Sequence, residues 1–139
     1  MEESIRKSFD LSGRAPETYS PLTLAYIGDA VYELIIRTVI SEEGEASAKA
    51  HTKKGTQLAK AVTQAQMARG LIADDFLTEE EQAVYKRGRN TSITHSAKNA
   101  TVSEYRAATG LEALIGWLFI QNRDGRMFEL VRRGWETLQ

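Results

Sequence analysis

The sequence predicts an all-α fold. Its length suits a single domain over residues 1–139, of which residues 1–19 form a polar N-terminal extension. Apolar residues recur at helical spacing along most of the chain, and no stretch alternates apolar and polar residues between turn signals as strands do. Two capping boxes, each a threonine followed three residues later by a glutamate, mark helix starts at Thr78–Glu81 and Thr101–Glu104.

The first helix is expected to begin after Ser20, because serine is a good N-cap and Pro21 suits the first helical position. It should run to about Ile40 and stop near Gly44. On a helical wheel one face is apolar and consists of Leu24, Ile27, Gly28, Val31, Leu34 and Ile35. The flank of this face carries an acid, Asp29, which we therefore expect to be partly buried.

The second helix is expected to open at Ser47, to be rich in lysine, to bend or make a close contact at Gly55, and to end near Gly70. The third follows the first capping box to Arg87 and is terminated by Gly88. The two remaining helices should extend from the second capping box to about residue 121, and from about residue 125 to 138.

A polar loop, GRNTSITHSAKNAT, fills residues 88–101 between the third and fourth helices. Its arginine, lysine, amide and hydroxyl groups suit contacts to phosphates and sugars, and loops of this length are often functional. A flexible connector explains the same composition equally well. The formal net charge of -1 does not by itself indicate a nucleic-acid binder, and the clustered lysines and arginines form either a basic face or solvated helix surfaces.

The residue types present exclude several classes of protein. Without cysteine there can be no disulfide, thiolate catalysis or cysteine-based zinc site, and only His51 and His95 offer imidazole groups. No segment has the length and apolarity of a signal peptide core or a membrane span. We therefore expect a cytoplasmic protein with no membrane association.

Two acids lie on apolar helices without a basic neighbour on the same helix. Asp29 has no lysine or arginine within one turn on either side, and neither has Glu112 on the fourth helix. A buried carboxylate without compensation is costly, so a group outside each helix must stabilise it. If the two helices pack together, the pair forms an oxygen-ligand site for a hard cation such as Mg²⁺; a basic side chain or backbone N–H groups elsewhere are the alternative.

Four motifs together resemble Mini-ribonuclease III, the short bacterial relatives of ribonuclease III. They are LAYIGDAVYE at 24–33, KRGRN at 86–90, AKNA at 97–100 and YRAATGLEALIGWLF at 105–119. Each motif is short, so the specificity of the resemblance lies in their common order and spacing. It covers the chain from about Leu22 to Phe119.

The resemblance implies an all-α ribonuclease III fold, a homodimer, and Mg²⁺-dependent cleavage of double-stranded RNA. The implied substrate is the stem that joins the ends of the large-subunit (23S) ribosomal RNA precursor, with a large-subunit ribosomal protein assisting. Asp29 and Glu112 match the acids of the first and last motifs, which implies that both are catalytic metal ligands. The implied RNA contacts are Arg87, Arg89, Asn90, Lys98 and Asn99, and the lysine-rich second helix adds Lys53.

The sequence departs from full-length ribonuclease III at two positions, Ala25 and Thr109, where those relatives usually carry further acids. Fewer carboxylates favour Mg²⁺ held largely through water and RNA phosphate oxygens. We also expect no double-stranded-RNA-binding domain after Glu112. A non-catalytic RNA-binding or ribosome-assembly module of the same fold remains the alternative function, and a helical bundle used only for protein contacts would have no RNA affinity.

Overall fold

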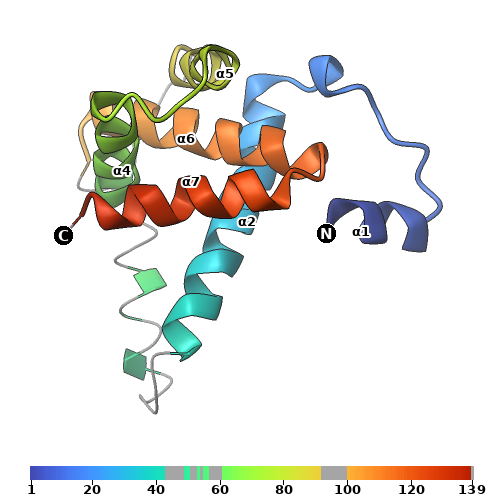
Figure 1. The fold of residues 1–139 in the computed structure, drawn as a ribbon, viewed down its shortest axis with the longest axis horizontal. Helices are drawn as coiled ribbons and strands as arrows, with labels where there is room; N and C mark the ends of the chain where they lie inside the picture. Colours follow the sequence, from blue (N-terminus) through green and yellow to red (C-terminus); the bar gives the residue numbers. More distant parts are fainter. Residues whose placement is uncertain (43–48, 51–52, 54, 57–60, 92–99, 139) are drawn as a thin grey trace.

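The structure, a computed structural model, describes residues 1–42, 49–50, 53, 55–56, 61–91 and 100–138 (Figure 1). All regular elements in these residues are helical, which confirms the predicted fold class. In chain order they are α1 (Glu2–Ser8), the short 3-10 helix η1 (Pro16–Thr18), α2 (Pro21–Glu42), α4 (Ala61–Ala73), α5 (Glu79–Arg89), α6 (Val102–Ile120) and α7 (Asp124–Glu136). None of the helices within the described ranges is both long and apolar enough to cross a membrane.

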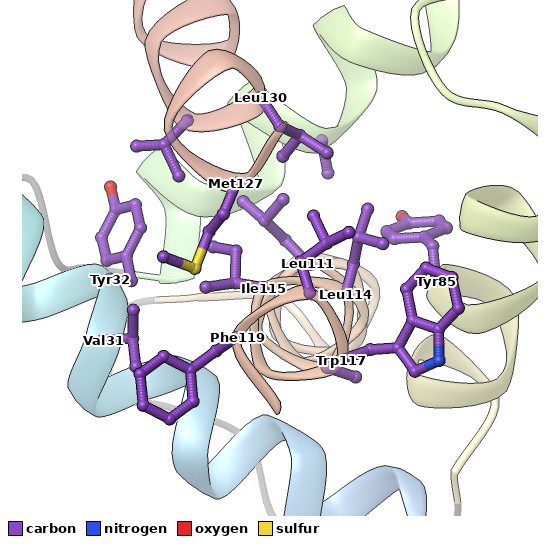
Figure 2. Close-up of a cluster of buried hydrophobic side chains, with 14 of the residues drawn as sticks. Val31, Tyr32, Tyr85, Leu111, Leu114, Ile115, Trp117, Phe119, Met127 and Leu130 are labelled. Atoms are coloured by element: carbon purple, nitrogen blue, oxygen red, sulfur yellow. The ribbon is translucent and has the colours of Figure 1, made fainter. Parts of the chain in front are cut away.

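Helix α6 lies at the centre of the fold, and α2, α4, α5 and α7 pack around it (Figure 1). Every residue of α6 from Ala107 to Phe119 is buried except Glu112. Figure 2 looks along α6 and shows its apolar side chains pointing outward on several sides, towards the surrounding helices. A helix that is apolar on all sides is stable only when neighbours cover it, so Glu112 is carried by the most enclosed helix of the molecule.

Helix α2 begins as predicted, since the Ser20 hydroxyl accepts the backbone N–H of Thr23 at 3.1 Å. Its buried face differs from the predicted one. Leu34, expected in the core, is 51% exposed, whereas Tyr32 and Ile36 are completely buried. The reason is that Tyr32, Ile36 and Ile40 form one buried stripe at helical spacing, and Leu34 lies on the opposite side of the helix.

Two glycines allow the backbones of α2 and α6 to touch where the helices cross. A Cβ atom on Gly28 would overlap the carbonyl oxygen of Glu112 and lie 2.7 Å from its carbonyl carbon. On the other helix, a Cβ on Gly116 would overlap the carbonyl oxygen of Leu24. Because any side chain would push the helices apart, the two glycines permit this close approach of α2 and α6. The crossing places residue 29 of α2 beside residue 112 of α6.

The other helix boundaries agree with the sequence to within a few residues. Both predicted capping boxes are present, with the threonine hydroxyls of Thr78 and Thr101 each accepting a backbone N–H three residues later. Helix α5 does not end at Gly88, as predicted, but continues through it to Arg89. Gly88 is needed for packing instead, since a Cβ there would lie 2.7 Å from the Cβ of Ala113. The predicted helix start at Ser47 lies outside the described residues.

The N-terminal extension contains α1, which the sequence did not predict. No residue of α1 is buried. The helix is attached to the turn between α6 and α7, where the backbone N–H of Glu3 donates to the Asn122 side chain at 2.8 Å, and Asn122 donates to Glu2 at 3.0 Å. A short helix held by polar contacts lacks the apolar periodicity from which sequence patterns identify helices.

A buried ion pair joins α5 to α7. The Glu81 carboxylate is completely buried and accepts two hydrogen bonds from Arg126, at 2.7 and 2.9 Å. The same arginine donates to the carbonyl of Phe76 at 2.8 Å. Burial alone would raise the pKa of Glu81, but the hydrogen bonds from Arg126 and from the Thr78 backbone outweigh it and lower the pKa. The pair therefore depends on both partners.

We expect Arg126→Met to lower the free energy of unfolding by about 3–5 kcal/mol, because it leaves the Glu81 charge buried without a partner. Urea unfolding followed by circular dichroism measures this loss. Arg132→Met is the matched control, since Arg132 lies on the same helix, is 85% exposed and forms an exposed ion pair with Glu136. The control should change stability by less than about 0.5 kcal/mol. Equal effects of the two substitutions would contradict the importance of the buried pair.

Candidate active site

The crossing of α2 and α6 brings Asp29 and Glu112 into direct contact. The two side chains are hydrogen-bonded, and this contact raises the pKa of Glu112. Glu112 is half-buried, as expected, but Asp29 is exposed and not partly buried as the sequence predicted. Asp29 lies on the side of α2 that faces away from the core, whereas Glu112 lies on the central helix. The pair thus spans from solvent to interior.

The pKa of Glu112 is raised to about 9. Burial is the largest cause, followed by the hydrogen bond to Asp29 and the negative charge of that residue, and the hydrogen bond from Gln64 opposes them. Two carboxyl groups in contact cannot both ionise freely in a partly desolvated place. A bound cation would be favourable at the place where the site holds a proton. Strongly shifted pKa values of this kind are common at functional sites.

Gln64 on α4 is the third side chain of the site. It is 2% exposed, and its amide Nε2 donates to Glu112 Oε2 at 3.4 Å. The sequence analysis did not identify this residue. Gln64 lies in the buried stripe of α4, among Ala65, Ala68 and Leu71. The sequence signal that could have identified it is a polar residue at an otherwise apolar position of the helix.

The donor set fits a hard divalent cation. Carboxylate oxygens are the ligands that Mg²⁺ prefers, and in the part of the chain that the structure describes no lysine or arginine forms an ion pair with Asp29 or Glu112. Within the described part of the chain, no three or more aspartate, glutamate, histidine or cysteine side chains form a group that could hold a metal ion. The two positions that departed from full-length relatives add no ligand, since Ala25 has none and the Thr109 hydroxyl donates to the Tyr105 carbonyl at 3.0 Å. Two carboxylates leave most coordination positions to water and substrate.

The predicted RNA-binding arginines of α5 do not share one face. Arg87 lines a hollow of about 480 Å³ between η1, α5 and α6, together with Trp117. Arg89 lies on another side of α5, where its guanidinium is 5.8 Å from the centre of the Tyr85 ring and its Nε donates to the side chain of Asn90 at 3.1 Å. The structure thus groups Arg89 with Asn90 and separates both from Arg87.

Arg69 on α4 joins the basic group at Arg89, and the sequence analysis did not single it out. The charges of Arg89 and Arg69 both lower the pKa of Tyr85, although burial raises it further and the net shift is upward. Arg69 also donates to the Ser103 hydroxyl at 3.2 Å. Ser103 precedes Glu112 by nine residues on α6, or about 13 Å along the helix axis. Two cations therefore lie near Tyr85, and one of them contacts the first turn of α6.

Two of the predicted RNA contacts, Lys98 and Asn99, lie outside the described residues, as do both histidines, His51 and His95. Lys53 is described and exposed.

Comparison with known proteins identifies similar sequences over most of the chain. The profile of the family described as Ribonuclease III domain matches residues 22–123. Mini-ribonuclease 3 of Clostridium tetani is 46% identical over 114 residues, which cover 81% of this chain and 74% of that protein. Mini-ribonuclease 3 of Enterococcus faecalis is 41% identical over 110 residues, covering 79% of this chain and 83% of that protein.

A similar fold occurs in the crystal structure of protein FN1578 from Fusobacterium nucleatum. The TM-score is 0.77, with 30% sequence identity, and the match covers 88% of this chain and 96% of that one. The matched family region contains Asp29, Gln64 and Glu112, so all three residues of the site lie in the shared part of the chain.

Proposed function

We propose, from the premise that this chain belongs to the ribonuclease III family, that Asp29 and Glu112 are the catalytic metal ligands of the enzyme. By that membership the chain is an endoribonuclease that acts on double-stranded RNA. One observation carries the assignment of the site: a half-buried acid in the enclosed part of the central helix meets an exposed acid of α2 at a crossing that two glycines make possible.

Mg²⁺ is the cofactor that we propose. When bound, it supplies positive charge that polarises the scissile phosphate and makes a nearby water more acidic. Asp29 is exposed and thus accessible to an RNA backbone, while Glu112 is held from the interior by Gln64. Attack by water leaves a 5′-phosphate on one product and a 3′-hydroxyl on the other. No histidine or serine nucleophile is needed.

The experiment that tests this function uses one RNA in two forms. A labelled duplex and its separated strand are incubated with the protein, in Mg²⁺ and in EDTA. We expect cleavage of the duplex only, in Mg²⁺ only, with 5′-phosphate ends. Binding of the duplex without cleavage would instead support the non-catalytic RNA-binding module.

For the substrate, we propose the stem that joins the ends of the 23S ribosomal RNA precursor, with a large-subunit ribosomal protein as an assisting partner, in the cytoplasm. The order of the four sequence motifs supports this assignment. Cleavage of this stem can be compared with that of a shuffled duplex of the same length and composition, before and after adding large-subunit proteins. Equal rates on both duplexes in both conditions would contradict the proposed substrate.

We propose a homodimer whose interface includes the exposed side of α2. Along this side lie Leu22, which is 48% exposed, Tyr26, which is 81% exposed, and Leu34. Leu34 also borders a cavity of about 730 Å³ between α2 and α7, lined by Phe128 and Trp135. Exposed apolar side chains grouped on one helix favour a contact with another protein. A second copy fits, because an interface here would bring the two sites near the symmetry axis, opposite the two RNA strands.

Tyr26→Arg is expected to weaken the dimer at least about a hundredfold, because it places a charge in the centre of the proposed interface. Sedimentation velocity over a range of protein concentrations measures the change. Ile72→Arg is the control, since Ile72 is an exposed apolar residue on α4, outside the proposed interface. If the Tyr26 variant sediments as the parent does, the interface lies elsewhere.

We propose that RNA phosphates contact Arg89 and Asn90, together with Lys98 and Asn99 from the following loop. Arg69 extends the same basic group. Arg87 and Lys53 remain proposed contacts, on other parts of the surface. Such contacts read the shape of A-form RNA and need no base recognition.

Replacing Arg89 and Lys98 together by alanine is expected to weaken RNA binding. The slope of log K against log salt concentration should become shallower by roughly 1–2, because binding releases about one counterion fewer for each phosphate contact that is lost. Binding of a labelled duplex at several salt concentrations measures the slope. Lys7→Ala on α1 removes an exposed cation elsewhere and should leave the slope unchanged. An unchanged slope in the double variant would mean that these residues do not touch RNA.

A further inference from the structure

Glu112 cannot hold a cation in a defined geometry unless its carboxylate is fixed. The last torsion of a glutamate side chain is broad, so the carboxylate plane rotates easily when nothing binds it. In the structure one donor acts on it from the interior, the Gln64 amide at 3.4 Å from Oε2. That amide comes from a third helix, α4, which contributes neither of the two acids.

The position of Gln64 is itself fixed by packing. The residue is 2% exposed and lies in the buried stripe of α4. One turn further on, the Met67 side chain packs against α7, where a Cβ on Gly134 would lie 2.9 Å from Met67 Cε. Helix α4 therefore cannot slide or rotate freely relative to the core, and packing fixes the position of the Gln64 amide.

An amide is unusual in this stripe, because burying one costs free energy that an apolar side chain would not. Its type suits a ligand-orienting role. A lysine or arginine at this place would orient Glu112 too, but it would cancel the negative charge that attracts a cation. A neutral donor orients the carboxylate and leaves its charge available.

We propose that Gln64 is a positioning residue, which orients the Glu112 carboxylate for divalent cation binding and thereby sets the cation affinity of the site. The inference rests on the proposed function of Asp29 and Glu112 as metal ligands. Partners that orient metal ligands are typically worth about ten- to a hundredfold in metal affinity.

The test measures Mn²⁺ binding to the RNA-free protein by titration calorimetry, so that it does not depend on catalysis. Gln64→Met keeps the volume and removes the donor, and Gln64→Ala removes both. Gln66→Met is the matched control, since Gln66 lies on the same helix and is exposed. We expect both Gln64 variants to bind Mn²⁺ at least about tenfold more weakly than the parent, and the control to bind as the parent does.

Two further readouts separate positioning from a purely structural role. In cleavage assays the Mg²⁺ concentration for half-maximal rate should rise by the same factor in Gln64→Met, with a smaller change in the rate at saturating Mg²⁺. Thermal unfolding in EDTA reports stability alone. If Gln64→Met melts earlier but binds Mn²⁺ within twofold of the parent, the residue is structural and the inference is wrong.

The outcome also distinguishes this inference from the function on which it rests. A parent protein that binds Mn²⁺ through Asp29, with affinity insensitive to Gln64, would overturn the inference only. A parent protein that binds no Mn²⁺, or binds it equally well after Asp29→Asn, would overturn both proposals.

Discussion

Asp29→Asn is expected to reduce the rate of duplex RNA cleavage in Mg²⁺ by about a thousandfold or more. The substitution keeps the size of the side chain but removes one of the two carboxyl groups of the site. A loss of about 4 kcal/mol in transition-state stabilisation corresponds to this factor and is of the size expected for a metal ligand. Single-turnover cleavage of a labelled duplex measures the rate.

The fold should not change in this variant, because Asp29 is exposed and makes no contact with a basic group among the residues described here. Helix content and the molecular mass in solution are expected to match those of the parent. Asp74→Asn is the matched control: an exposed aspartate paired only with Arg133, its replacement should leave cleavage unaffected. Cleavage by the Asp29 variant at the parental rate would exclude Asp29 from the metal site.

Gly28→Ala is expected to affect stability and activity together. The added Cβ would overlap the carbonyl oxygen of Glu112, so α2 and α6 must separate. Overpacking at a backbone contact should lower the free energy of unfolding by about 3 kcal/mol or more. The same shift moves Asp29 away from Glu112, and a displacement of about 1 Å can cost roughly a hundredfold in rate. Urea unfolding and cleavage assays measure the two effects.

Gly125→Ala is the control for this prediction. Gly125 also lies in a helix, α7, but a Cβ there would meet no atom within 4 Å. Stability should stay the same or rise by up to about 1 kcal/mol, since alanine is the better helix former. A Gly28 variant as stable and active as the Gly125 variant would contradict the role of the helix crossing in forming the site.

Much of the fold could be predicted because its signals are local. A serine before proline, and a threonine three residues before glutamate, act on the backbone N–H groups of their own helix, and the structure has all three of these helix starts. Asp29 and Glu112 were recognisable for a similar reason. Each lacks a basic neighbour within its own helix, and that absence can be read from sequence spacing alone.

The features that sequence patterns missed depend on contacts between helices. Leu34 was expected in the core because α2 is apolar on several sides, but the neighbouring helices cover the stripe of Tyr32 and Ile36 on the opposite side. Gly88 was interpreted as a helix end, whereas it serves close packing on α6. Gln64 could not be identified because its hydrogen bond is to Glu112, which is 48 residues away on another helix.

The central claim is that Asp29 and Glu112 together bind the divalent cation of the enzyme. The most direct measurement is an anomalous difference map from a crystal of the protein soaked in Mn²⁺. The account predicts one strong peak at the α2–α6 crossing, within about 2.5 Å of a carboxylate oxygen of each residue, and its loss in a crystal of the Asp29→Asn variant. A map with no peak between these two side chains, or a peak that survives the substitution unchanged, would contradict it.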